Sequence, residues 1–230
     1  MLETVFQVLF WFSFCLLGYT FCGFPAVISC LARLFPKKVH TDESTKPSIS
    51  IVLAAHNEEN RIEARIQNLL ASDYPADRIE LIIVSDGSTD RTVERGKSFN
   101  DHRVRVIAEP QRSGKAHCLN AGVAAARGEI IVFGDMRQRF EPDTIARLAS
   151  HFADPSVGAV SGALEIEKSA SAIGGGVDAY WKLEKFIRFS EARFDSSIGC
   201  TGAVYAIRRD CFRPVPADTI LDDVVIPMQI

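Results

Sequence analysis

Residues 4–31 contain no charged side chain, and this long apolar run constrains the fold more than any other feature of the sequence. As an α-helix the run would be about 42 Å long, and the hydrocarbon core of a bilayer is about 30 Å thick. One helix can therefore span a membrane, with a tilt or a break near Gly23 and Pro25. A cleaved signal peptide is the competing interpretation. The run is too long for a signal peptide, and no A-x-A-like cleavage site follows it. The residues before it include the acidic Glu3 and no Lys or Arg, whereas a signal peptide begins with positive charge.

Three basic residues follow the apolar run, namely Arg33, Lys37 and Lys38. Because positive residues favour the cytoplasmic side of a membrane, we expect the rest of the chain to face the cytosol. The sequence therefore divides into a single N-terminal membrane anchor at residues 1–36, a polar linker at residues 37–47 and a larger domain at residues 48–230.

The charge of the whole chain is nearly balanced, with a formal net charge of -3 at pH 7. Proteins that follow a phosphate backbone usually carry a clear basic excess, so nucleic acid is not expected as a partner. The six cysteines form no CxxC pair, which argues against zinc and favours a reducing compartment for the larger domain.

The larger domain alternates between apolar strands and helices. The first expected helix has Ile62, Ile66 and Leu69 at helical spacing. The repeated strand–helix–strand order predicts an α/β fold with a doubly wound, mostly parallel sheet, which binds ligands at the carboxyl ends of its strands. Gly128 is expected to close the third helix in the usual C-terminal position. The expected strands lie at residues 48–53, 81–84, 104–108 and 129–133, and the later helices at residues 92–99, 114–127 and 142–152.

Polar residues follow the first two strands, at the edge where a ligand would bind. Asn57 can cap the following helix and Glu58 favours its positive end, but backbone and carboxylate groups here can also meet a nucleobase or a ribose. Asp86 follows the second strand. Because Ser88 or Asp90 can cap the next helix, Asp86 is not needed for capping and suits a hydrogen bond to a base or a ribose hydroxyl.

Lys115 follows the third strand, in a segment that is similar to part of a phosphate loop. The full GxxxxGK[ST] pattern is absent, because position 109 is Glu and position 116 is Ala. A lysine at a helix N-terminus can still bind an anion, so Lys115 and Arg112 are candidates to hold a diphosphate; the alternative is a solvated side chain. Asp135 follows the fourth strand, where a carboxylate can hold Mg²⁺ or Mn²⁺, although Asp is also a common turn residue.

Taken in order, these segments resemble the family 2 glycosyltransferases, which include cellulose, chitin and hyaluronan synthases and many bacterial polysaccharide enzymes. The resemblance rests on an N-terminal anchor followed by IVLAAHNEE, VSDGSTD, GKAHCLNAG, an apolar strand ending in Asp135, GCTGAVYAIRR and LDDVVIP. It covers about residues 47–230. Each motif is weak alone, but the ordered set is specific. The family has the GT-A fold, a Rossmann-like sheet flanked by helices, which agrees with the sheet predicted above.

The resemblance implies roles for the donor-side residues. Asp86 would contact the nucleotide base, and the segment around Ala55 and Glu58 would line the same pocket. Lys115 matches a family lysine near the diphosphate. Asp135 matches the first carboxylate of the DxD motif, which holds a divalent cation, Mg²⁺ or Mn²⁺, and the diphosphate.

The resemblance also implies an acceptor side and a reaction. Gly202, Ala203 and Arg208 lie in the segment that borders the acceptor site. Asp223 matches the last residue of the T/E-E-D motif, the general base, and Asp222 stands beside it. The implied function is an inverting transfer of a sugar from a nucleotide-diphosphate sugar, with a UDP-sugar as the expected donor, to a carbohydrate or lipid-linked acceptor at the cell (inner) membrane.

Two departures from the family pattern bear on this expectation. Arg137 stands where the DxD motif would place its second carboxylate, so that Arg137 could contact phosphate directly. The sequence also ends at Ile230, before the Q-x-x-R-W region and the further membrane segments of the family, which predicts that the catalytic domain is incomplete at its C-terminus. A non-catalytic membrane subunit that binds a nucleotide sugar or a partner synthase is therefore the alternative function.

Two other interpretations concern a competing activity and a pair of aromatic residues. A sugar nucleotidyltransferase would need a Gly-rich N-terminal loop with following Arg and Lys, and AAHNEEN has neither. Tyr180 and Trp181 lie in an expected amphipathic helix at residues 176–194, where they could stack on acceptor sugars or pack in the core or at the membrane surface.

Overall fold

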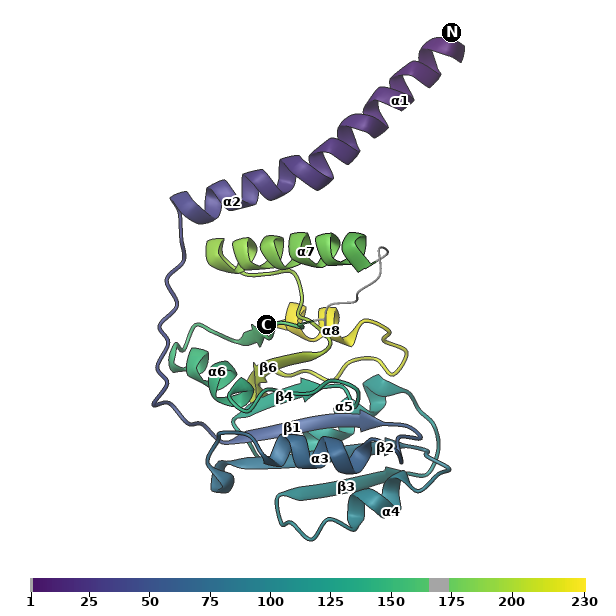
Figure 1. Ribbon diagram of the computed structural model, residues 1–230, viewed down its shortest axis with the longest axis vertical. Coiled ribbons are helices and arrows are strands. Elements are labelled where there is room, and N and C mark those ends of the chain that lie inside the picture. The colour runs from purple at the N-terminus through teal and green to yellow at the C-terminus, as the bar shows by residue number, and fades with distance from the viewer. Residues whose placement is uncertain (1, 166–173) are drawn as a thin grey trace. The chain divides into compact units, whose positions relative to one another are not determined.

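The computed structural model describes residues 2–165 and 174–230 of the chain, which form two compact units (Figure 1). The first unit joins the N-terminal segment, up to Lys38, with a segment that ends at Ile198. The second unit holds the sheet and extends from Val39 to Glu165 and from Gly199 to Ile230. The helix that contains Tyr180 and Trp181 therefore belongs by its contacts to the unit of the N-terminal segment.

The N-terminal segment is one continuous helix, 33 residues long and apolar enough to cross a membrane. Its middle is a π-helical turn, which lies at the predicted break because Pro25 has no backbone N–H and its ring disturbs the preceding turn. The first part of the helix buries none of its side chains within the protein, so its apolar surface is available to lipid. The three parts are α1 (Leu2–Gly18), η1 (Tyr19–Gly23) and α2 (Phe24–Leu34).

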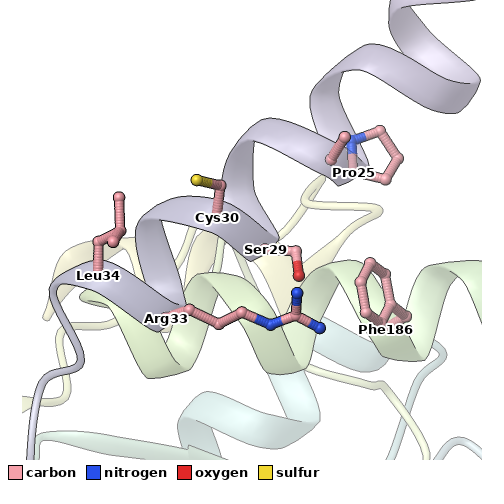
Figure 2. A pocket seen from close by; sticks show the side chains of 7 residues that line it. Pro25, Ser29, Cys30, Arg33, Leu34 and Phe186 are labelled. Carbon is pink, nitrogen blue, oxygen red and sulfur yellow. The ribbon is translucent and has the colours of Figure 1, made fainter.

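The end of this helix packs on α7 (Gly174–Phe194). Ile28 and Ala32 are buried on α2, and Ser190 is buried on α7. A hollow of about 390 Å³ lies beside this contact (Figure 2). It belongs to the first unit and contains none of the predicted site residues. The residues that line it are Pro25, Ala26, Ser29, Cys30, Arg33, Leu34 and Phe186.

The second unit is built on a six-stranded sheet with the strand order β3-β2-β1-β4-β6-β5. The first four strands are parallel, which confirms the predicted mostly parallel sheet. The sheet continues with β6 antiparallel to β4 and β5 antiparallel to β6, and neither of these strands was predicted. The strands are β1 (Ile49–Ala55), β2 (Ile79–Asp86), β3 (Val104–Glu109), β4 (Ile130–Gly134), β5 (Ala159–Ser161) and β6 (Val204–Arg208).

Helices cover both faces of the sheet, as a doubly wound fold requires. On one face Ile62, Ile66 and Ile145, from two helices, are buried in a cluster with residues of β1, β2 and β4. On the other face Leu119 and Val123 belong to a second cluster. The helices of this unit are α3 (Ile62–Leu70), α4 (Thr92–Lys97), α5 (Lys115–Ala125), α6 (Thr144–Ser150) and α8 (Asp222–Val225), with the short 3-10 helices η2 (Ala76–Arg78), η3 (His151–Ala153), η4 (Arg209–Cys211) and η5 (Pro227–Gln229).

The predicted role of Gly128 was wrong. Helix α5 ends at Ala125 and the chain is already extended at Ala126, so Gly128 does not cap the helix. A Cβ atom on Gly128 would lie 2.5 Å from the backbone nitrogen of Ser50. Glycine is needed here because the chain passes close to the start of β1 before it enters β4.

Candidate active site

The segments that follow β1 and β2 interlock at the carboxyl edge of the sheet. The His56 Nδ1 atom lies 2.6 Å from the backbone oxygen of Asp86. The Thr89 backbone N–H donates to Asn57 Oδ1 at 2.9 Å. Asn57 has a φ of 53° and stands well before α3, so it shapes this turn and does not cap the helix, contrary to the capping interpretation. Glu58 follows it and pairs with Arg61 at 2.9 Å.

Asp86 joins the end of β2 to the start of α5. Its buried carboxylate accepts hydrogen bonds from the backbone N–H of Ser113 at 2.6 Å and of Gly114 at 3.1 Å. Gly87 allows this approach, because its φ is 55° and a Cβ atom there would lie 2.5 Å from the backbone nitrogen of Arg112. A carboxylate has further lone pairs, so Asp86 can still accept from a base or a ribose.

Lys115 is the first residue of α5 and forms a bridge between two carboxylates. Its Nζ atom lies 3.3 Å from Asp135 Oδ1 and 3.1 Å from Asp222 Oδ2. Burial by itself would lower the pKa of Lys115, but the two carboxylates raise it overall. The structure thus brings together three residues that the sequence placed after separate strands or in the last motif.

Asp222 is the buried member of this cluster, with a side chain only 7% exposed. Burial raises the pKa of Asp222, the nearby Lys115 lowers it in part, and Asp223 adds a like charge that raises it. The Tyr205 hydroxyl is buried beside these acids, and burial followed by the charge of Asp222 raises its pKa. Asp222 Oδ2 is paired with Lys115 Nζ, whereas the Tyr205 hydroxyl has no hydrogen-bond partner within the described part of the chain.

Asp223 lies next to the predicted acceptor-side glycine. Its Oδ2 atom is 2.8 Å from the position that a Cβ atom on Gly202 would take, so any larger side chain there would displace the carboxylate. The backbone oxygen of Ala203 is 3.4 Å from the corresponding Cβ position on Gly134, at the end of β4. Gly202, Ala203 and Asp223 therefore lie at the same edge of the sheet as Asp135.

Arg208 does not lie with them, and its predicted place beside the acceptor site was wrong. Because β6 runs antiparallel to β4, Val204 pairs with Gly134 at the carboxyl end of β4, whereas Arg208 pairs with Ile130 at the other end. The Arg208 guanidinium donates to the backbone oxygens of Val157, Phe152 and Asp154 at 2.8–2.9 Å. Its contacts are those of a structural residue.

The segment after β4 carries Asp135 and Arg137, and it is contacted by two residues of α3 that the sequence did not point out. Arg137 is exposed and forms no ion pair with any residue in 2–165 or 174–230. Arg65 and Asn68, both on α3, contact the end of this segment at Phe140. They had no signal in the sequence, because they lie inside a regular helix far from the segment that they contact.

A divalent cation fits this site if the substrate supplies some of its ligands. Asp135 offers a half-exposed carboxylate, and no group of three His, Cys, Asp or Glu side chains that could bind a metal occurs within the described ranges. Mg²⁺ and Mn²⁺ favour oxygen ligands, and Mg²⁺ commonly takes one or two carboxylates with phosphate oxygens and waters. The donor set here therefore suits a cation that arrives with a diphosphate.

Similarity to known proteins identifies the family of this chain. The sequence profile of Glycosyl transferase family 2 matches residues 50–214. The chain belongs to this family. The family explains why the motifs occur in the observed order, and the GT-A fold that it implied is confirmed.

Three similar proteins illustrate the family. The chain is 27% identical over 173 residues to poly-beta-1,6-N-acetyl-D-glucosamine synthase of Staphylococcus aureus, a match that covers 71% of this chain and 42% of that protein. The structure of a mannosyltransferase from Pyrobaculum calidifontis, in complex with GDP-Man and Mn²⁺, is similar with a TM-score of 0.76 at 26% identity, over 91% of this chain and 60% of that one. Glucosyl-3-phosphoglycerate synthase from Mycobacterium tuberculosis, in complex with Mn²⁺ and UDP, has a TM-score of 0.51 at 26% identity, over 75% and 62% of the two chains. The chain thus spans less than half the length of the curated relative named first.

Proposed function

We propose that this chain carries the donor site and the general base of an inverting glycosyltransferase, which transfers a sugar from a nucleotide-diphosphate sugar to an acceptor hydroxyl. The observation that carries the proposal is the bridge of Lys115 between Asp135 and Asp222. The Lys115 ammonium lies between two acids at the carboxyl edge of an α/β sheet. At this edge a diphosphate and an acceptor hydroxyl can meet. The N-terminal helix would hold this domain at the cytosolic face of the cell (inner) membrane.

On the donor side, Asp86 would receive the nucleotide and Lys115 would contact the diphosphate. The side chain of Lys115 is 40% exposed, so its ammonium can turn from the carboxylates to a phosphate oxygen without leaving the site. A divalent cation held by Asp135 and the phosphates would neutralise charge on the leaving diphosphate. Lys115 acts in the same direction, because its charge meets negative charge that grows as the glycosidic bond breaks.

On the acceptor side, Asp223 would act as the general base. The acceptor oxygen attacks the anomeric carbon, the bond from that carbon to the diphosphate oxygen breaks, and the hydroxyl proton passes to Asp223. The nucleoside diphosphate leaves with the bonding electrons. A single displacement with one base inverts the anomeric configuration. Asp222 then serves to hold Lys115, whose charge it faces at 3.1 Å.

The relatives support a nucleotide-sugar donor. The named complexes of similar structures contain GDP-Man or UDP with Mn²⁺, and the named relative is a polysaccharide synthase. We propose a UDP-sugar as the donor and a growing carbohydrate or a lipid-linked sugar as the acceptor. The non-catalytic alternative rests on Arg137 in place of the second acid of the DxD motif, but Asp135, Lys115 and Asp223 are all present, which supports catalysis.

The test is a screen of nucleotide sugars with the full-length protein in membranes, with Mg²⁺ or Mn²⁺, by release of nucleoside diphosphate. We expect Asp223→Asn to abolish transfer and leave nucleotide binding largely intact, and Asp135→Asn to weaken both. The exposed Asp210, on η4, provides the control Asp210→Asn, which should behave as wild type. Full activity of both site variants would refute the assignment. Binding of a nucleotide sugar by the wild type with no turnover would favour the non-catalytic subunit.

A further inference from the structure

Arg65 is a buried cation with an incomplete set of hydrogen bonds. The residue is 3% exposed, yet within residues 2–165 and 174–230 its guanidinium donates a single hydrogen bond, from Nη1 to Asn68 Oδ1 at 2.9 Å. Its Nε and Nη2 atoms have no partner in the part of the chain that the structure describes. The guanidinium lies over the ring of Phe140, 4.2 Å from its centroid. Burying a charged group with unused donors is costly, so a fold that keeps one has a reason to place it there.

The unused donors lie against the end of β4. A Cβ atom on Gly134 would be 3.2 Å from Arg65 Nη2, which places this atom beside the residue that precedes Asp135. Burial lowers the pKa of Arg65 to about 10, and the charge of Asp135 opposes that shift. Because a group with this pKa is protonated at neutral pH, Arg65 carries a positive charge near the backbone that leads into Asp135.

Asn68 fixes the other end of the same segment. Its Oδ1 atom accepts from the Phe140 backbone N–H at 2.9 Å, and its Nδ2 donates to the Phe140 backbone oxygen at 2.8 Å. The segment from Asp135 to Phe140 is thus held at its start by β4 and at its end by Asn68. Arg65 contacts both ends, through Gly134 and through the Phe140 ring.

Comparison with Arg208 separates this arrangement from ordinary packing. Both guanidinium groups lie over a phenylalanine ring, but Arg208 uses its donors on three backbone oxygens. Within the described residues the Arg65 guanidinium makes one hydrogen bond, and the Asp135 carboxylate is the charged group that raises its pKa against the effect of burial. That carboxylate is especially dependent on its surroundings, since Arg137 replaces the second acid of the motif.

We propose that Arg65 is a positioning residue for the donor site: it fixes the segment that follows β4 and holds the Asp135 carboxylate where a divalent cation and a diphosphate can use it. This inference rests on the proposed function. Groups that orient a metal ligand typically change metal affinity 10- to 100-fold when they are removed. Asn68 supports the same segment from the same helix and acts together with Arg65.

The test measures Mn²⁺-dependent binding of UDP, and of GDP in a parallel arm, by titration calorimetry of the full chain in detergent. Arg65→Met should weaken Mn²⁺-dependent nucleotide binding by about 10-fold or more. Arg65→Lys retains the charge without the planar fork and should recover part of that loss. Arg105→Met is the matched control: Arg105 also has an unpartnered Nε within the described residues, but it contacts Glu80 and the backbone of Ala125. The control should bind as wild type.

A thermal unfolding curve of each variant separates positioning from stability. If Arg65→Met unfolds at the temperature of Arg105→Met and still binds Mn²⁺ and UDP as wild type does, Arg65 has only a structural role and the inference is refuted. If Arg65→Met does not fold, Arg65→Lys decides, and unchanged Mn²⁺ affinity in that variant refutes it equally. If the wild type binds neither nucleotide with Mn²⁺, the proposed function itself fails; normal wild-type binding with unchanged Arg65 variants overturns only the positioning role.

Discussion

Replacing Lys115 by Met should destabilise the fold mainly through the buried Asp222, since Asp135 is half-exposed, and replacing Asp222 as well should restore most of the stability. At 3.1 Å the Lys115–Asp222 attraction is about 5 kcal/mol for an effective dielectric constant of about 20. Since Lys115 is 40% exposed, desolvation and solvent screening reduce the net contribution to about 1–3 kcal/mol. Met keeps the length and apolar stem of Lys, so Lys115→Met leaves Asp222 buried without its counter-charge. We expect the free energy of unfolding to fall by that amount.

The assay is a double-mutant cycle measured by chemical unfolding of the full chain in detergent. Asp222→Asn in the Lys115→Met background removes the isolated charge and should restore most of the loss, with a coupling energy of about 1 kcal/mol or more. Lys97→Met, at an exposed position on α4, is the control and should be neutral. A coupling below about 0.5 kcal/mol would refute the reasoning. The double variant should remain unable to bind nucleotide, which separates stability from donor binding.

The same cycle has a pH dependence with a definite sign. Burial raises the folded-state pKa of Asp222 above its ordinary value, so the stability linked to its proton is present at low pH and is lost as the pH rises through the folded pKa. Removing Lys115 raises that pKa further, because the attraction that lowers it disappears. The deficit of Lys115→Met should therefore shrink at acidic pH and be largest above neutrality.

Three further outcomes follow from other contacts. Gly87→Ala should lower the free energy of unfolding by about 2 kcal/mol or more, because the residue has a φ of 55° and its Cβ would lie 2.5 Å from a neighbouring backbone nitrogen; chemical unfolding measures this. Arg137→Asp should strengthen Mn²⁺ binding in a calorimetric titration by adding the missing carboxylate, whereas the exposed Arg139→Asp should not. A hydrogen bond from Arg103 lowers the pKa of Asp101 to about 2, so Asp101→Asn should cost about 1 kcal/mol or less at pH 7, and this difference in thermal unfolding should vanish as the pH falls from about 4 toward 2.

The parallel strands could be predicted because β1, β2 and β4 are almost fully buried and their sequences are mostly apolar, and because β3, the partly buried edge strand, follows them in the same strand–helix rhythm. Strands β5 and β6 could not, since β5 has three residues and β6 joins the sheet through a partner far along the chain. The direction of β6 explains the error on Arg208. Gly202 and Arg208 are close in sequence, but the chain between them crosses the sheet, so only Gly202 lies at the edge that carries Asp135.

The candidate site likewise contains residues that could be predicted from the sequence and residues that could not. Asp86, Lys115 and Asp135 could be found because each follows an apolar strand, and strand ends converge at one edge of a parallel sheet. The bridge of Lys115 to Asp222 was not predicted, because it depends on how α8 approaches α5. The two residues are far apart in the sequence, and no local pattern indicates that they meet. Arg65 left no trace in the sequence, since an arginine inside an amphipathic helix is ordinarily a solvated residue.

The pairing of β5 with β6 has a consequence for how such proteins can diversify. The chain leaves the sheet after Ser161 and re-enters it at Val204, and these two points are neighbours, since Ser161 pairs with Tyr205. The stretch between them, which includes α7, therefore starts and ends at neighbouring positions of the sheet. Its length and composition can change over evolution while the strand register stays intact. A sheet of this kind can accept changes in that stretch while Asp135 and Lys115, which lie outside it, keep their places.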